Sequence, residues 1–182
     1  MITCKNIASK KVGFFFDCLN FISFPAVAIL QAIQVKYDKD IIKKSIDNNE
    51  ALWCGCDFSK YISREHGILD KEAFNYKDVF NIEFDMDKCD EITYRASSPS
   101  HAVVIKGYNL KHGKTNGYLI ENSWGDESGD NGYYFMSEEW LENYMFEIVV
   151  DKKYVPKKVE NILKTTPIVL PYWSIFNSLL KK

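Results

Sequence analysis

The chain has 182 residues, of which 46% are hydrophobic, 15% aromatic and 26% charged, and its formal net charge is −2. This composition is that of an ordinary globular protein and excludes a disordered chain, because the aromatic content is high and the charge imbalance is small. The near-neutral charge gives no electrostatic attraction for nucleic acid or an acidic membrane surface, so nucleic acid is not expected as a partner. Five cysteines, an odd number without a framework spacing, argue against a disulfide-stapled secreted domain and favour a reducing compartment.

The first element in chain order is an apolar stretch from residue 12 to residue 30. Lysines precede it and Ala26-Val27-Ala28 lies within it, a pattern that also suits a signal peptide. Asp17, Asn20 and Pro25 interrupt the apolar run, however, and a charge at the centre of a bilayer costs about 2.5–3.5 kcal/mol. A buried helix or a poorly folded remnant is therefore expected here. A targeting segment is the alternative, and no membrane is expected as a partner.

The next part of the chain holds one predicted helix and one predicted strand. Isoleucines recur on one face of residues 39–49, which predicts a short amphipathic helix. The apolar run 51–54, closed by Gly55, predicts a buried strand that leads into a turn. Residues 58–98 show no clear period, so loops with one or two short helices are expected there.

The C-terminal half is predicted to be rich in strands. Short helices are expected after Ser137, which suits an N-cap, and at 156–163. Strands joined by hairpin-length loops, with helices at the edges, are typical of an antiparallel α+β fold. β-branched and aromatic runs predict these strands at 101–108, 117–122, 133–136 and 145–150.

Two short motifs in the C-terminal half carry side chains suited to catalysis. His101 opens one predicted strand, and Asn122 ends the next, followed closely by Trp124. If the two strands pair as a hairpin, the histidine and the asparagine meet at one end of the sheet. An amide that orients an imidazole, under an indole that excludes water, prepares the imidazole to take a proton from a thiol. The alternative is structural: a histidine at a strand start, and a turn with an aromatic plug.

The residues around these motifs carry a resemblance to a known family. His101-Ala102, Asn122-Ser123-Trp124-Gly125 and Gly132-Tyr133 resemble motifs of the papain-like cysteine peptidases. The resemblance extends from about residue 35 to residue 173. Three further stretches are similar to the branch that contains bleomycin hydrolase and aminopeptidase C, namely 52–57, 147–156 and 167–173.

The resemblance implies a fold and a division of the chain. The fold is α+β and papain-like, mainly the antiparallel β-barrel half with flanking helices, and the helical half that bears the nucleophile is expected to be largely missing. The implied parts are an atypical apolar segment (1–34), a candidate remnant of the nucleophile helix; a papain-like β-rich domain (35–165) that carries the histidine and the asparagine; and a C-terminal tail (166–182).

The resemblance also implies an activity, that of a cytoplasmic cysteine-type aminopeptidase, a thiol protease that hydrolyses peptides and assembles as a hexamer. On this basis His101 is the general base, Asn122 the residue that orients it, and Trp124 a supporting residue. A homo-oligomer or mixed oligomer is expected, and no cofactor or metal. The family tail limits cleavage to the peptide's N-terminal end. Here the tail ends in Lys181-Lys182, which would repel a substrate amine.

The nucleophile is the family feature that this sequence lacks. In papain relatives the histidine follows the cysteine by about 130–150 residues, but only 100 residues precede His101. None of the five cysteines is followed by tryptophan, as the family's nucleophile is. A faint match of residues 14–20 to the family sequence after the nucleophile places Gly13 in the nucleophile's position. Because a triad without its nucleophile loses nearly all its benefit, the chain is expected to be inactive alone.

Three functions therefore remain open at the level of sequence. The first is a truncated, bleomycin-hydrolase-like cysteine aminopeptidase with base and orienting residue but no nucleophile. The second is a non-catalytic interaction subunit that associates with a full-length relative. The third is a secreted or anchored protein that reuses the β-rich domain as a binding module.

Overall fold

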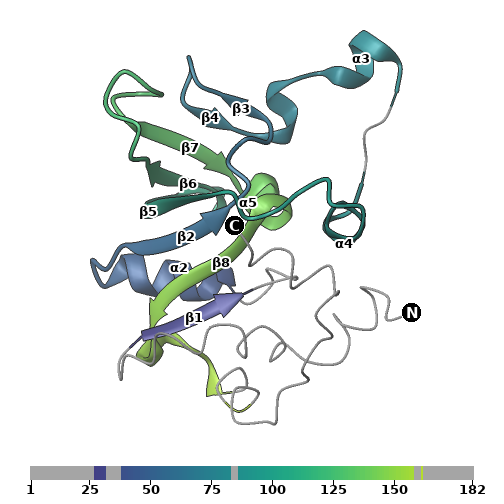
Figure 1. Ribbon diagram of the computed structural model, residues 1–182. Helices are drawn as coiled ribbons and strands as arrows, with labels where there is room; N and C mark the ends of the chain where they lie inside the picture. Colours follow the sequence, from purple (N-terminus) through teal and green to yellow (C-terminus); the bar gives the residue numbers. More distant parts are fainter. Residues whose placement is uncertain (1–26, 32–37, 83–85, 158–160, 162–182) are drawn as a thin grey trace.

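A mixed sheet, with short helices packed against it, forms the architecture (Figure 1). The computed structural model describes residues 27–31, 38–82, 86–157 and 161. Within these residues the sheet has eight strands in the order β1-β8-β2-β5-β6-β7-β4-β3. Neighbouring strands are antiparallel, except that β4 pairs with β7 in parallel. The strands are β1 (Val27–Gln31), β2 (Leu52–Cys56), β3 (Ile62–Ser63), β4 (Ile68–Leu69), β5 (His101–Lys111), β6 (Lys114–Glu121), β7 (Tyr133–Ser137) and β8 (Met145–Asp151).

The helices in the described part of the chain are short. None of them has the length and apolar content needed to cross a bilayer. Two pack against the sheet, and α3 projects away from it (Figure 1). The helices are α2 (Asp38–Asp47), η3 (Lys71–Ala73), α3 (Tyr76–Phe80), α4 (Lys88–Thr93), α5 (Glu138–Tyr144) and η4 (Lys152–Tyr154).

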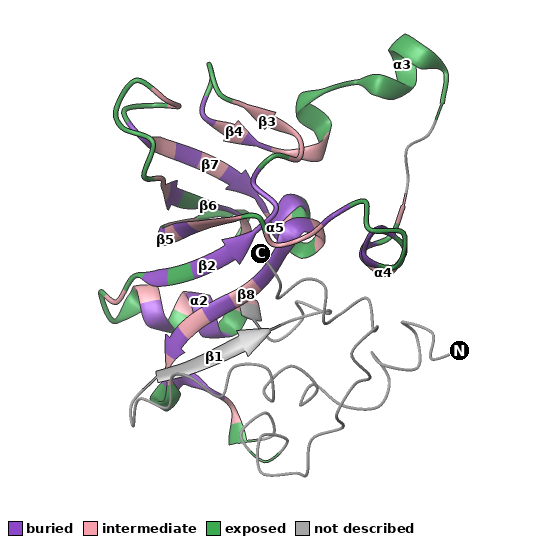
Figure 2. Ribbon diagram, viewed as in Figure 1, coloured by how far each residue is buried: buried purple, intermediate pink, exposed green. Residues whose placement is uncertain are grey.

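The core lies between one face of the sheet and the helices α2 and α5. Successive side chains of a strand point to opposite faces, so alternate residues such as Val103 and Ile105 of β5 enter the core. Helix α2 contributes Ile41 and Ile42, which are fully buried. Helix α5 contributes Trp140, whose indole Nε1–H donates to the carbonyl of Lys60 at 2.7 Å. Figure 2 shows the resulting band of buried residues along β2, β8 and α5, and the exposed α3.

The β5–β6 hairpin determines which residues meet at its open end. Its two-residue turn, His112-Gly113, has positive φ at both positions (52° and 76°), the condition for a type I′ turn. Two register shifts follow within the hairpin, and the pairing continues to Val104 opposite Glu121. The residues just beyond this pair, at the start of β5 and after β6, therefore lie at the same end of the sheet.

Most of the predicted elements are present in the structure. The helix expected at 39–49 is α2, the strand at 51–54 is β2, and the four C-terminal strands are β5 to β8. Ser137 is the N-cap of α5, because its side chain accepts from the backbone N–H of Trp140. The α+β class is thus observed.

Two expectations differ from the structure, and a third falls mostly outside the described residues. The helix considered for 12–30 is wrong for Val27–Gln31, which pairs with β8 as a strand, and the rest of that stretch lies outside the described residues. Residues 58–98 contain the two-residue strands β3 and β4 in addition to helices, because these strands are too short to show a period. The helix expected at 156–163 falls mostly outside the described residues, where the chain leaves η4.

Gly117 in β6 provides a test of this packing. A Cβ added there would meet the ring of Phe135 at 2.3 Å and the carbonyl oxygen of Met136 at 2.8 Å. We expect Gly117→Ala to lower the free energy of unfolding by about 1–3 kcal/mol, the usual cost of overpacking. The shift of the urea midpoint measures this loss.

The matched control is Gly107→Ala in the paired strand β5. There the nearest atom to an added Cβ, the Cβ of Leu119, is 3.4 Å away. The control should change the free energy of unfolding by less than about 0.5 kcal/mol. Equal losses in the two variants would show that Phe135 does not occupy the space over Gly117.

Candidate active site

The open end of the β5–β6 hairpin brings His101 and Asn122 together. His101 is the first residue of β5, and Asn122 follows directly after β6. Because Val104 pairs with Glu121, Asn122 comes opposite Val103 and shares a sheet face with His101. Diagonal neighbours of this kind lie within reach of long side chains. The imidazole Nε2 and the amide Oδ1 are 2.8 Å apart, a hydrogen bond.

The surroundings of the amide determine the direction of this hydrogen bond. The Oδ1 of Asn122 also accepts from the backbone N–H of Ser123 at 2.8 Å, which identifies this atom as the oxygen. An amide oxygen can only accept, so Nε2 of His101 carries the proton. In the neutral imidazole the lone pair then lies on Nδ1, and Nδ1 can accept a proton from a reacting group. The Nδ2 of Asn122 is buried and has no hydrogen-bond partner in the described part of the chain.

Aromatic rings cover the imidazole. The ring centroid of Trp124 is 4.9 Å from that of His101, and the centroid of Phe58 is 5.1 Å from it. Phe58 and Trp124 also touch each other edge to face, with centroids 5.2 Å apart. Arg64 lies over the Trp124 ring, 4.6 Å from its centroid. These rings cover one side of a hydrogen bond that is itself part-buried, and so reduce its contact with water, where a hydrogen bond adds only about 1 kcal/mol net.

Sequence reasoning missed two residues that contact the site or its support. Phe58 touches His101, and Asp57 is a buried carboxylate that binds the segment leading into β5. Both follow β2, which pairs with β5 so that Cys56 lies opposite His101. The sequence did hold one indication of their role, because a polar residue and an aromatic residue come directly after a buried strand. Their partners are far away in sequence, however, and could not be inferred from it.

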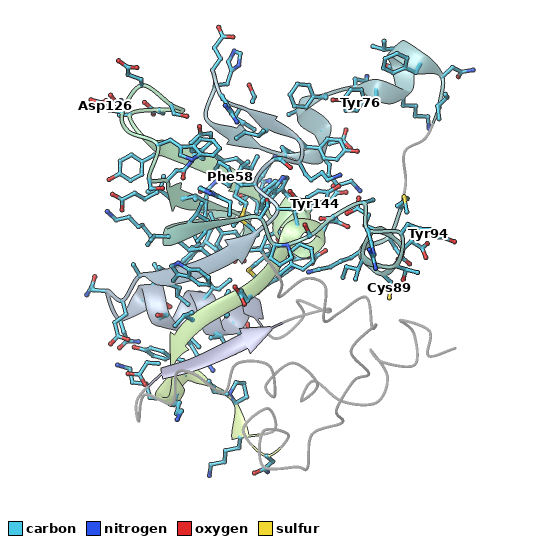
Figure 3. The ribbon with its side chains drawn as sticks, in the orientation of Figure 1. Phe58, Tyr76, Cys89, Tyr94, Asp126 and Tyr144 are labelled. Atoms are coloured by element: carbon cyan, nitrogen blue, oxygen red, sulfur yellow. The ribbon has the colours of Figure 1, made fainter. Side chains whose placement is uncertain are left out.

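The cysteines of the described residues do not supply a thiolate to His101. Cys54 and Cys56 are free but fully buried. A hydrogen bond with the Cys56 thiol, together with burial, raises the pKa of Cys54, so its thiol stays protonated. Cys89 on α4 is disulfide-bonded, which the cysteine count did not predict, and it lies well apart from Phe58 (Figure 3).

No hydrogen bond joins His101 to a cysteine in the part of the chain that the structure describes. Cys4, Cys18 and Gly13, the residue proposed for the nucleophile's position, lie outside that part. The same residues contain no group of three or more His, Cys, Asp or Glu side chains that could hold a metal ion.

Besides Asp57, a second buried carboxylate, that of Glu91, contacts the segment that leads into β5. Glu91 of α4 accepts a hydrogen bond from the hydroxyl of Tyr144 at 3.2 Å, and its other carboxylate oxygen is buried without a partner in the described residues. Burial raises the pKa of the Glu91 carboxyl and also the pKa of Tyr144. The backbone carbonyl of Glu91 accepts from the N–H groups of Ala96 and Ser97, so Glu91 also holds the residue whose hydroxyl donates to Asp57.

The raised pKa of Glu91 predicts a pH dependence of stability. A carboxyl whose pKa is higher in the folded state binds more protons there than in the unfolded state. The stability of the protein should therefore fall as pH rises from the ordinary carboxyl range through the raised pKa. Glu91→Gln removes this titration. Urea unfolding between acid and neutral pH should show the stability of the unsubstituted protein, relative to this variant, decreasing as pH rises.

Glu127→Gln, in an exposed loop, is the control for the loss of one carboxylate. The free energy of unfolding of the unsubstituted protein, minus that of Glu91→Gln, should fall with pH. If this difference stays constant or rises with pH, burial does not raise the pKa of the Glu91 carboxyl.

The imidazole hydrogen bond has a direct spectroscopic consequence. Asn122→Ala removes the acceptor of the Nε2–H, so exchange of that proton with water should accelerate roughly five- to tenfold. Proton–nitrogen NMR of the histidine rings at low temperature measures this rate. Asn143→Ala, which removes an exposed amide bonded to the carbonyl of Glu139, should leave the rate unchanged. Slow exchange in the Asn122 variant would mean that another acceptor holds the proton.

Comparisons with known proteins identify relatives of the chain. The model of the Peptidase C1-like family matches residues 12–176. Bleomycin hydrolase of Gallus gallus is 37% identical over 147 residues, which cover 79% of this chain and 32% of the relative. Aminopeptidase C of Listeria monocytogenes is 33% identical over 158 residues, which cover 83% of this chain and 36% of the relative. The chain thus spans about a third of the length of these curated relatives.

A solved structure shows the same fold. PepW of Lactobacillus rhamnosis matches with a TM-score of 0.72 and 33% sequence identity, over 76% of this chain and 32% of that one. The α+β, papain-like fold class expected from the sequence is confirmed by this match.

Proposed function

Because the chain belongs to the Peptidase C1-like family, we propose that it carries the proton-transfer half of a cysteine aminopeptidase site. His101 is the general base and Asn122 the residue that orients it. The observation that carries the proposal is the 2.8 Å hydrogen bond from Nε2–H to Oδ1, because it leaves Nδ1 free to accept a proton. Trp124 supports the pair by covering it.

The chemistry of these residues follows from their roles. In a cysteine peptidase an imidazole takes the proton of a thiol, and the thiolate attacks the carbonyl carbon of the peptide bond. The imidazolium then gives the proton to the leaving amine, and water hydrolyses the acyl-enzyme. His101 would hold that proton on Nδ1 in each cycle. Asn122 would keep the ring in one orientation and one tautomer throughout.

The proposal extends to what the chain does by itself. None of its five cysteines is followed by tryptophan, as the family's nucleophile is, and Cys54 and Cys56 are buried thiols. The 182-residue chain should therefore not hydrolyse peptides alone, because loss of a nucleophile removes nearly all of the benefit of the remaining residues. Peptides, presented by their N-terminal end, are the proposed substrate class of a complete site.

The division of the chain is part of the same proposal. Residues 35–165 are the papain-like β-rich domain, residues 166–182 the tail and residues 1–34 an atypical segment. A cytoplasmic location and a homo-oligomer or mixed oligomer are also proposed, because the resemblance to the bleomycin hydrolase and aminopeptidase C branch implies them.

A second candidate function is an interaction subunit that binds a full-length relative. The observation that favours it is on the sheet face opposite the core, where Trp53 of β2 is 40% exposed and Leu119 of β6 is 46% exposed. A partner that packed on this face would bury both side chains. This function does not require proton transfer at His101.

Activity measurements test the proposal in two steps. The purified chain should release aminomethylcoumarin from aminoacyl substrates no faster than its His101→Ala variant, with or without iodoacetamide. A chimaera should then be prepared in which residues 38–157 replace the matching part of PepW. Its hydrolysis should fall by roughly 10²–10⁴-fold on His101→Ala, the usual contribution of a general base.

The control in the chimaera is His66→Ala, an exposed residue between β3 and β4, which should retain full activity. Iodoacetamide-sensitive hydrolysis by the chain alone would contradict the absence of a nucleophile. A chimaera indifferent to His101→Ala would contradict the role of the base. Co-elution of an inactive chain with a full-length relative would favour the interaction subunit instead.

A further inference from the structure

We propose that Asp57 is a positioning residue for His101: its buried carboxylate holds the segment Ser97–Ser100, from which the chain enters β5, and so fixes the direction in which the imidazole projects. The role of His101 as a base rests on the function proposed above. The positioning itself is a statement about the folded chain, and it can be tested without turnover.

The carboxylate of Asp57 is bound to this segment at three points. It is 5% exposed. Its Oδ2 accepts from the hydroxyl of Ser97 at 2.9 Å and from the backbone N–H of Ser98 at 3.3 Å. Its Oδ1 accepts from the hydroxyl of Ser100 at 3.3 Å, and also from that of Ser59 at 2.7 Å. Three of the four donors therefore lie within four residues of His101, on the segment that precedes it.

The charge of Asp57 makes these bonds strong and directional. No ion pair to Asp57 occurs among the residues that the structure describes. A buried carboxylate without a cation is costly unless donors point at it. Hydrogen bonds to a charged acceptor are about twice as strong as neutral ones. These hydrogen bonds therefore restrain the hydroxyls of Ser97 and Ser100, and with them the backbone that carries these two residues.

The main chain of Asp57 is fixed from the other side. Its N–H donates to the carbonyl of Tyr144 at 2.9 Å, where α5 meets β8. The preceding carbonyl, that of Cys56, accepts from the N–H of Ser100 at 3.0 Å. The backbone of Asp57 is thus anchored where the sheet meets α5, and the hydrogen bonds from Ser100 restrain the residue just before His101 relative to this anchor.

The residue after Asp57 completes the arrangement. Phe58 packs on the imidazole with ring centroids 5.1 Å apart, and it also contacts Trp124. Figure 3 shows Phe58 within the cluster of side chains beside α5. Asp57 therefore holds the backbone from which His101 projects, and Phe58 contacts its ring. Two consecutive residues of one turn constrain both ends of the same side chain.

A role in stability alone would have a different signature from a role in positioning. If Asp57 only stabilises the fold, deleting any hydrogen bond to its carboxylate should affect the exchange of the His101 Nε2–H proton in proportion to the strength of that bond. If it positions His101, only the bonds that cross to Ser97–Ser100 affect the imidazole. The Ser59 hydroxyl, which bonds the same carboxylate from within the turn itself, separates these two cases.

The experiment is proton–nitrogen NMR of the full, isotope-labelled chain. The readout is the exchange rate of the His101 Nε2–H proton. His66 and His112 are internal references because both are exposed and neither is hydrogen-bonded to Asp57. Ser97→Ala and Asp57→Asn should each accelerate the exchange roughly five- to tenfold. Ser59→Ala should change it by less than about twofold, although it deletes a shorter bond to the same carboxylate.

Exchange that is unchanged in both Ser97→Ala and Asp57→Asn would overturn the proposal, as would an equal acceleration in Ser59→Ala. Ser97→Ala removes only one hydroxyl, so it decides the case if Asp57→Asn fails to fold. Unprotected Nε2–H in the unsubstituted chain would instead contradict the proposed function, because the bond to Asn122 would then be absent.

Discussion

The register of the β5–β6 hairpin is the constraint on which the candidate site depends. A strand that slips by one residue turns all of its side chains to the other face, and Asn122 would then point away from His101. The pairing is set by the His112-Gly113 turn, where two positive φ angles favour a tight two-residue loop. From this turn the two strands stay paired, across two register shifts, from Lys111 opposite Lys114 to Val104 opposite Glu121. The geometry of the imidazole is therefore determined in part by a turn at the far end of the hairpin.

Local pattern was sufficient to predict the parts of the fold that sequence neighbours control. The isoleucines of α2 recur with the period of a helix, and the β-branched run after His101 suits a strand. Ser137 has the chemistry of an N-cap, and the structure uses it as one. The meeting of His101 with Asn122 was predictable for the same reason, because both residues belong to adjacent strands of one hairpin.

Contacts between distant parts of the chain were beyond such reasoning. Asp57 and Ser97 are separated by 40 residues, and nothing in either neighbourhood indicates the other. The strands β3 and β4 have two residues each, too few for alternation to be visible. β1 is a strand because β8 offers it a partner, not because its composition excludes a helix. In each case the local structure is stabilised by a partner that is distant in the chain and that the local sequence does not indicate.

The backbone N–H of Ser123 decides which nitrogen of His101 is free, since it is what prevents the Asn122 amide from turning over. Turned by half a rotation, the amide would present its NH₂ group to the Ser123 N–H and lose that bond, and its hydrogen bond to His101 would require the other tautomer, with the lone pair on Nε2. Every amino acid except proline supplies that N–H. Evolution is thus free to vary the exposed side chain at this position, while the tautomer of a histidine on the neighbouring strand stays the same.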